Sequence, residues 1–280
     1  MAALLALASA VVWGAADFGG GLASRRFPAI AVVGWSQLGG LLALGAVALV
    51  TDAGNAPTGW LLWSLGAGVA GALGLWSFYE ALAIGTMGVV SPITALGSVV
   101  PVVAGLMAGE RPSTMQAAGI FMALGGAVAA SGPELSGKAL SGTSGRRSVA
   151  AATAAGVLFG LVLVAIHGGA RYSPLMTLVG MRVVSVAGFG VAAVAMRTTG
   201  GVRASALPGI GAIGVADASA NLTFGFASTM GMVSVVSVLA GLYPVTTVLL
   251  ALVVLRERLL PVQAVGITTA LVGVALLAAG

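Results

Sequence analysis

The sequence predicts an all-α integral membrane protein whose ten transmembrane helices form two inverted five-helix repeats. Three observations lead to this fold class: the composition, ten long apolar runs, and a similarity between the two halves. The 280 residues are 59% hydrophobic and only 7% charged, with a mean hydropathy of +1.12. Soluble domains carry about 25% charged residues, so this chain has too few charges to cover a surface in water. Lipid must therefore be its solvent, and the 44 glycines suit helices that pack closely in lipid.

The composition also excludes several kinds of site. The chain has no cysteine, which rules out disulfides, thiolate metal sites and cysteine nucleophiles. Its net charge of +5 comes from basic residues that fall mostly in short loops. There they act as topology signals and contact anionic lipid, so nucleic acid is not an expected partner. The N-terminal apolar run lacks a preceding basic segment, and we expect a retained helix rather than a signal peptide.

Apolar runs of about 17–25 residues predict the spans in order. The ten runs are 2–23, 29–50, 59–84, 87–108, 114–131, 149–170, 174–196, 206–229, 232–254 and 262–279. The clearest separators are SRRFP at 24–28, DAGNAPTG at 52–59, GERPS at 109–113 and LRERLLP at 255–261. The shortest breaks lie at 85–88 and 229–232, so the count of ten depends most on these two joints.

A segment rich in Ser, Gly and charge, residues 131–148, separates spans five and six and predicts a flexible linker. We therefore divide the chain into a first repeat at 1–132, a linker at 133–148 and a second repeat at 149–280. Gly132, Gly137 and Lys138 match the spacing of a phosphate-binding loop. Ala139 follows where such a loop needs Ser or Thr, and no strand precedes it, so nucleotide binding is not expected.

The two halves align almost without gaps when the sequence is shifted by 146 residues. The shift places Gly14 on Gly160, Arg25 on Arg171, Pro28 on Pro174, Ala81 on Ala227, Gly85 on Gly231, Ser91 on Ser237 and Leu96 on Leu242. After one inserted residue, Glu110 falls on Glu257, Gly119 on Gly266 and Gly126 on Gly273. So long a series indicates internal duplication. Because five helices is an odd number, the second copy enters the membrane from the opposite side, and in transporters such repeats enclose a midplane substrate site.

Three segments resemble the drug/metabolite transporter superfamily in its ten-helix EamA-type branch. They are Trp13-Gly14, FYEALAIGTMGVVSPITAL at 78–96 and LAGLYPVTTVLLALVVLRERL at 239–259. The resemblance covers essentially the whole chain. It implies a secondary transporter that moves small metabolites or drugs across the cytoplasmic (inner) membrane, often outward. It also implies a central cavity walled mainly by spans 1, 3, 4, 6, 8 and 9.

The resemblance further places spans 5 and 10 at the periphery. Independently, Gly119 and Gly126 in span 5, and Gly266 and Gly273 in span 10, are spaced seven residues apart on one helix face. This spacing predicts a close-packed glycine seam on each of the two helices.

The chain departs from many members of this superfamily in its intramembrane charge. A basic residue is common in their second span, but here that span carries Ser36 and Gln37. The intramembrane arginine lies in the second repeat instead, as Arg182, which aligns with Ser36. The substrate site of relatives therefore cannot be transferred to this chain.

The first candidate binding residue is Asp17, an acid inside the apolar run VVWGAADFGGGL. Trp13, Asp17, Gly20 and Ser24 recur at helical spacing and share one face of span one. A carboxylate beside an aromatic ring suits an amine or another cation, and it can also carry a proton. The alternative is a structural role in which Asp17 pairs with Arg182. Ionisable groups at membrane depth are functional candidates, so we include both Trp13 and Asp17 in the predicted substrate site.

Span eight supplies a second acid, Asp217, with Asn221 on the same face. Its repeat partner is Gly71, so the acid is not a remnant of the duplication and is a functional candidate. His167 in span six is the only histidine and aligns with Gly21, one turn beyond Asp17; its alternative is a packed or interfacial role. We expect Asp217, Asn221 and His167 to converge on the same cavity as Asp17.

Three further residues complete the predicted substrate site. Glu80 lies near the end of span three, where a solvated interfacial charge is the alternative. Arg182 can bind a carboxylate bidentately or neutralise Asp17 or Asp217. Tyr243 precedes Pro244, which loosens the helix where a ligand could reach the backbone.

A membrane enzyme is the main competing class, and a non-transporting lipid-handling or partner protein is another. The chain has no H-E-x-x-H, no pair of histidines and no G-x-S-x-G, and the inverted repeat favours transport. We therefore expect no enzymatic activity, no cofactor and no metal ion. The expected partners are a small-molecule substrate and the lipid bilayer, with protons as a candidate coupling ion. Monomer and homodimer both remain open.

The distribution of basic residues predicts the orientation. Loops with odd numbers hold nine basic residues: Arg25, Arg26, Lys138, Arg146, Arg147, Arg197, Arg203, Arg256 and Arg258. Even loops hold only Arg111 and Arg171. Because positive charge is retained on the cytoplasmic side, the odd loops should be cytoplasmic and both termini outside. Relatives usually keep both termini in the cytoplasm, so here charge and family habit disagree.

Overall fold

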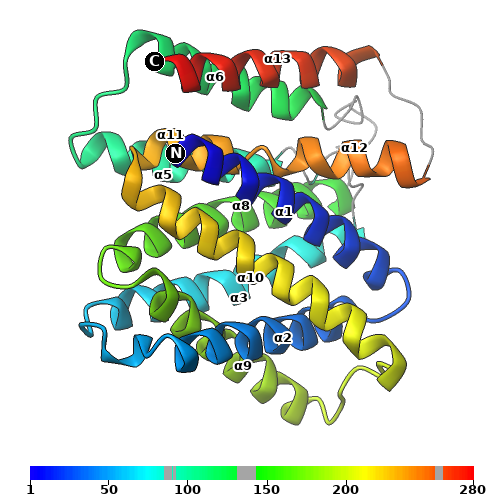
Figure 1. Ribbon diagram of the computed structural model, residues 1–280. Coiled ribbons are helices and arrows are strands. Elements are labelled where there is room, and N and C mark those ends of the chain that lie inside the picture. The colour runs from blue at the N-terminus through cyan, green and yellow to red at the C-terminus, as the bar shows by residue number, and fades with distance from the viewer. Residues whose placement is uncertain (85–89, 91–92, 131–142, 256–260) are drawn as a thin grey trace.

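The computed structural model describes the whole chain except residues 85–89, 91–92, 131–142 and 256–260. The described residues form helices and no strands, which confirms the all-α fold class (Figure 1). The first half contains α1 (Ala2–Ser24), α2 (Ala29–Val50), α3 (Trp60–Ile84), the 3₁₀ turn η2 (Leu96–Ser98), α5 (Val99–Met107) and α6 (Thr114–Ala130). The second half contains α8 (Thr143–Ala170), α9 (Pro174–Ala195), α10 (Leu207–Met230), α11 (Val233–Ala240), α12 (Tyr243–Leu255) and α13 (Pro261–Ala279). Each predicted span thus corresponds to helix in the described part of the chain.

Length and hydropathy make this a multi-pass membrane protein. Among the described residues, six helices are long and apolar enough to cross a membrane: α1, α2, α3, α8, α9 and α10. Four shorter apolar stretches, at Ile93–Met107, Thr114–Ala129, Val233–Thr247 and Pro261–Leu277, fall where spans 4, 5, 9 and 10 were predicted. The joint predicted at 229–232 is present, because α10 ends at Met230 and Gly231 is fully extended. The joint at 85–88 lies outside the described residues.

Local sequence signals set several helix ends. At the start of α6 the Gln116 amide nitrogen donates to the Ser113 hydroxyl, and the Ser113 amide donates back to the Gln116 side chain. This reciprocal cap satisfies two amides that lack partners within the helix. At the start of α9, Ser173 accepts from the Met176 amide, and Pro174 occupies the first helical position, where its missing N–H costs nothing.

α8 begins at Thr143, so its first turns lie within the segment that the sequence predicts as a linker, 133–148. Contacts with α3 stabilise this additional part of α8, residues 143–148. Arg147 forms an ion pair of 2.8 Å with Glu80, and the Ser148 hydroxyl donates to the Ala81 carbonyl at 3.0 Å. The rest of the linker, with its phosphate-loop-like spacing at Gly132–Lys138, lies outside the described residues.

The sequence predicts the ninth span as one continuous helix, but the structure has two helices there, α11 and α12. α11 stops at Ala240 and α12 starts at Tyr243, with Gly241 and Leu242 between the two helices. Pro244 explains the break, because it has no amide hydrogen to continue the helical ladder to Ala240. In the fourth span the η2 turn at Leu96–Ser98 occupies the aligned position, since Leu96 and Leu242 are repeat partners.

The helices pack in pairs drawn from opposite halves. α1 lies along α10, α3 lies along α8, and α2 contacts α9 at one edge of the molecule. α6 and α13 lie side by side at the opposite edge, away from α2 and α9 (Figure 1). Between α6 and α13 a Cβ on Gly126 would lie 2.3 Å from the Ala270 nitrogen, and one on Gly273 would lie 2.5 Å from the Ala123 nitrogen. This close approach confirms the predicted glycine seam and the peripheral position of spans 5 and 10.

The loops separate into two groups at the two ends of the bundle. Both termini lie at the same end (left in Figure 1). There Ala2 contacts Gly231, and Gly280 lies against Ser113. At the opposite end the indole of Trp35 donates to the Thr199 carbonyl at 3.3 Å. The termini therefore lie at the same end as the even-numbered loops. The orientation predicted from the basic residues assumes this arrangement.

Candidate functional site

A central cavity lies between the two halves of the chain. The cavity has a volume of about 120 Å³. The lining residues come from every span that the resemblance assigned to the cavity: 1, 3, 4, 6, 8 and 9. Spans 2 and 7 also contribute, which was not expected. They do so because Arg182 from α9 reaches the acid on α10, and Gln37 from α2 in turn binds Arg182.

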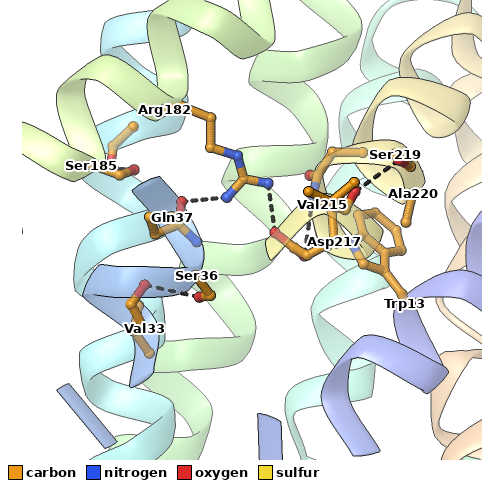
Figure 2. Close-up of polar contacts among 12 residues, drawn as sticks. Trp13, Val33, Ser36, Gln37, Arg182, Ser185, Val215, Asp217, Ser219 and Ala220 are labelled. Atoms are coloured by element: carbon orange, nitrogen blue, oxygen red, sulfur yellow. Dashed lines mark hydrogen bonds and ion pairs between the residues drawn. The ribbon is translucent and has the colours of Figure 1, made fainter. Parts of the chain in front are cut away.

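Arg182 is the centre of the polar network in this cavity (Figure 2). Its side chain is only 1% exposed, and its Nη2 donates to Asp217 Oδ2 at 2.5 Å. Its Nη1 donates to the side-chain oxygen of Gln37. Of the two acids that Arg182 could neutralise, the structure thus pairs it with Asp217. A guanidinium so far from water requires such partners, and here they come from α2 and α10.

The other carboxylate oxygen of Asp217 is held by two neutral donors. The Trp13 indole donates to Oδ1 at 3.1 Å, and the Asn221 amide donates to the same atom at 3.3 Å. The Asn221 amide also donates to the Asp217 carbonyl one turn back, at 2.7 Å. Because Trp13 belongs to α1 and Arg182 to α9, two helices besides α10 hold this one acid, and Gln37 from α2 holds the arginine (Figure 2). Four residues of the predicted substrate site, Trp13, Arg182, Asp217 and Asn221, thus lie together in this cavity.

Asp17 lines the same cavity, one helical turn beyond Trp13 on α1. It forms neither an ion pair nor a hydrogen bond with its side chain among the residues that the structure describes. The pair between Asp17 and Arg182, which was the structural alternative, is not formed in this structure. Asp17 is half-buried, so its carboxylate is available to the contents of the cavity.

Tyr243 lines the cavity at the break of the ninth span, as the Tyr-Pro pair suggested. Its phenol lies near the Thr94 side chain from the fourth span, which also lines the cavity. Close to this point the two interrupted spans touch, since a Cβ on Gly241 would lie 2.1 Å from the Ser98 hydroxyl. The 3₁₀ turn of span 4 and the break of span 9 therefore meet at the wall of the cavity.

Glu80 lies outside the cavity, although it was predicted as a site residue. Phe78 of the same helix lines the cavity, and two residues further the helix has turned through about 200°, so Glu80 faces away. Its carboxylate pairs with Arg147, with both side chains well exposed. This arrangement is the interfacial charge that the sequence offered as the alternative.

His167 also stays apart from the central cavity, contrary to the expected convergence. It lies in a separate pocket with Arg171, Phe226 and Thr229, toward the end that carries the termini. The position along α8 explains the difference, because His167 lies about one helical turn, roughly 6 Å, beyond Leu163, the last residue of that helix to line the cavity.

Several lining residues were not predicted from the sequence. Gln37 was noted only as a departure from relatives, yet its polar side chain at the middle of an apolar span was a usable signal. Phe78 and Phe159 pack edge to face with ring centroids 5.9 Å apart and line the cavity together. Nothing in the sequence separates these two aromatics from lipid-facing ones, because both lie in uniformly apolar helices.

These features define a class: a multi-pass helical membrane protein with a polar, charged cavity enclosed by both halves of the chain. The model of the EamA-like transporter family matches residues 1–132 and 146–279. The chain therefore belongs to the EamA-like transporter family, within the drug/metabolite transporter superfamily, and is a membrane transporter of that type.

Other comparisons bear on the fold alone. A solved structure titled "Crystal structure of protein" superposes with a TM-score of 0.81 over 98% of this chain and 96% of that chain. Its sequence identity of 19% makes it similar in architecture only. A comparison with curated proteins finds no match.

Proposed function

We propose that this protein exports small metabolites or drugs across the cytoplasmic membrane by alternating access around the central cavity. The observation that carries the proposal is the cavity itself. It combines an acid without a salt-bridge partner among the described residues, Asp17, with a braced ion pair, and both repeats contribute to its walls. Charged groups held at membrane depth at a repeat interface are typical of transport sites.

Matching contacts in the two halves support the proposed inverted repeat. On Gly14 a Cβ would lie 2.6 Å from the Tyr243 carbonyl, and on Gly160 it would lie 2.3 Å from the Gly97 carbonyl. Both partners in the second contact are the repeat equivalents of those in the first, at the shift of 146 residues. A two-fold relation between the halves generates such a pair of contacts, which a chance resemblance does not.

The same relation holds for whole helices. α1 packs on α10, and their repeat equivalents α8 and α3 pack on each other. If the two halves can exchange conformations, the cavity opens to one side of the membrane and then to the other. The crossing of the interrupted spans 4 and 9 at the cavity wall is a suitable place for this change, because interrupted helices bend more easily than continuous ones.

A membrane enzyme and a non-transporting lipid-handling protein are the competing functions. An enzyme would have to use Asp17, Asp217 and Arg182, but Arg182 and Asp217 are occupied by each other. Transport is therefore favoured, and its direction and membrane are proposed from the family resemblance.

The test is uptake of radiolabelled small solutes into vesicles that contain the purified protein. We expect wild type to carry at least one solute and Gly71→Leu to abolish the uptake. A Cβ on Gly71 would lie 3.3 Å from the flexible end of Met181, so a leucine can be accommodated while it fills the cavity. Gly66→Leu on the same helix is the matched control, because Gly66 is exposed and has no atom within 4 Å of an added Cβ.

Uptake that persists in Gly71→Leu would contradict a route through this cavity, and solute turnover without uptake would favour the enzyme. A proton gradient imposed on the same vesicles tests whether protons are the coupling ion, since coupling predicts faster uptake in one direction of the gradient only.

A further inference from the structure

The charges in the cavity do not balance. Three side chains with a formal charge line it in the described part of the chain: Asp17, Arg182 and Asp217. The Arg182–Asp217 pair, at 2.5 Å, cancels one negative charge. One negative charge, that of Asp17, remains uncompensated in a cavity whose other walls are mostly apolar or aromatic. An isolated carboxylate in such surroundings is unfavourable until a cation or a proton joins it.

The positive group is not available to an anion. Arg182 is 1% exposed, and both of its terminal nitrogens donate to protein acceptors, Asp217 and Gln37. Its Nε is also buried and lies next to Gly40, away from solvent. An anionic ligand, or the carboxylate of a zwitterion, would therefore enter the cavity without a free positive partner.

Asp217 is not available to a cation either. Its Oδ2 accepts from Arg182, and its Oδ1 accepts from Trp13 and Asn221. These three contacts fix Asp217 and also use the Trp13 indole N–H. The network therefore leaves Asp17 as the one carboxylate without an ion pair or a side-chain hydrogen bond among the described lining residues.

The remaining walls suit an organic cation rather than a metal ion. Trp13, Phe78, Phe159 and Tyr243 line the cavity around Asp17. Aromatic faces attract organic ammonium groups and also bury apolar ligand surface. A metal ion would need several oxygen ligands in addition to a single carboxylate.

From this charge balance we infer that the cavity takes a small organic cation with an aromatic or apolar body, and that Asp17 is its charge partner. The inference rests on the proposed transport function and names its substrate class. Asp17 and the aromatic walls select the ligand, and the Arg182–Asp217 pair is a positioning device that keeps Asp17 uncompensated.

The test measures dissociation constants of four matched probes with the full-length protein in lipid nanodiscs at pH 7. The probes are 2-phenylethylamine (a cation), 2-phenylethanol (neutral), 3-phenylpropionate (an anion) and phenylalanine (a zwitterion). We expect the amine to bind at least tenfold more tightly than the alcohol, and the other two no more tightly than the alcohol. A permanently charged probe, phenylethyl-trimethylammonium, should share the advantage of the amine, because it cannot lose its charge by giving a proton to Asp17.

Asp17→Asn should remove the advantage of the amine and leave the affinity for the alcohol unchanged. The control Asp52→Asn removes an acid from an exposed loop and should change neither. The inference is overturned if the anion or the zwitterion binds best, if no probe binds, or if the amine keeps its advantage in Asp17→Asn. The wild-type series alone suffices if Asp17→Asn fails to fold.

Uptake of the same probes separates this inference from the proposed function. If the anion or the alcohol is transported and Gly71→Leu stops it, the transport function stands and the cation inference fails. If the amine binds through Asp17 but never crosses the membrane, the ligand class stands and the transport function fails.

Discussion

Asp217 shows how a single acid at membrane depth is held by protein donors. Its side chain is 30% exposed and lines the cavity, while the Arg182 side chain opposite is 1% exposed. The pair is thus asymmetric: Asp217 faces the cavity and Arg182 faces the packed helices. Removal of either partner leaves the other without its counter-charge, and the consequence is greater for the more buried group.

This asymmetry gives a prediction at the residue scale. Arg182→Met should lower the free energy of unfolding by about 1–3 kcal/mol, because Asp217 loses its charged donor. Asp217→Asn should cost more, because it leaves a guanidinium that cannot reach water. The double variant should cost less than the sum of the two. Denaturation of the four proteins in mixed micelles measures the coupling, and additivity within about 0.5 kcal/mol would show that the pair does not interact.

At the scale of elements, helix ends and helix contacts carry the specific interactions. The short helix α11 has no side-chain cap of its own. Glu110, from the loop before α6, supplies one from the other half: its two carboxylate oxygens accept from the Val233 amide at 2.6 Å and the Ser234 amide at 2.9 Å. These are unsatisfied first-turn amides, where a negative charge is also favoured by the helix dipole.

Glu110→Ala should therefore destabilise the protein by about 1–3 kcal/mol, the cost of leaving such amides unpaired. The matched control is Glu80→Ala, which removes an exposed ion pair with Arg147 and should cost about 0–1 kcal/mol. Thermal unfolding in detergent compares the two variants. Equal effects would mean that Glu110 is no more than a surface charge.

The seam between α6 and α13 offers a second comparison, between adjacent glycines. On Gly126 an added Cβ would meet the backbone of α13 at 2.3 Å, whereas on Gly125 it would meet nothing within 4 Å. Gly126→Ala should thus force the helices apart and lower the free energy of unfolding by about 1–3 kcal/mol. Gly125→Ala should be neutral or stabilising, since alanine is the better helix former. Thermal unfolding of both variants checks this, and a harmless Gly126→Ala would disprove the close contact.

At the scale of the whole molecule, the two ends of the bundle differ in charge. The described odd-numbered loops and their adjoining helix ends carry Arg25, Arg26, Arg146, Arg147, Arg197 and Arg203. The end with both termini carries only Arg111 and Arg171 among the described residues. Because the even-numbered loops and both termini lie at one end of the bundle, the charge bias between odd and even loops is a difference in charge between the two ends of the molecule.

We therefore expect the arginine-rich end to face the cytoplasm and both termini to face outward. A reporter that is active only in the cytoplasm, fused after Gly280, should be inactive. The same reporter inserted in the linker near Lys138 is the positive control. Activity at Gly280 together with silence at the linker would reverse the orientation, in agreement with the habit of relatives.

The sequence alone determined the membrane fold, the spans and the identity of the charged candidates. Lipid as solvent requires long apolar helices, so composition and run length located the spans closely, and Pro244 indicated the loosening in span nine. Asp17, Asp217 and Arg182 stood out because ionisable groups are costly at membrane depth. These are local properties, which depend on a residue and its neighbours along the chain.

Only the tertiary structure decided which of these groups act together. Glu80 and His167 looked as eligible as Asp217, but helix rotation turned one away and distance along α8 separated the other. Gln37 became part of the site because α2 approaches α9 and α10, and the early start of α8 came from contacts with α3. The choice of Asp217 rather than Asp17 as the partner of Arg182 is of the same kind. Pairing depends on distances between helices, which are set by side-chain packing across the bundle and not by the pattern within any one helix.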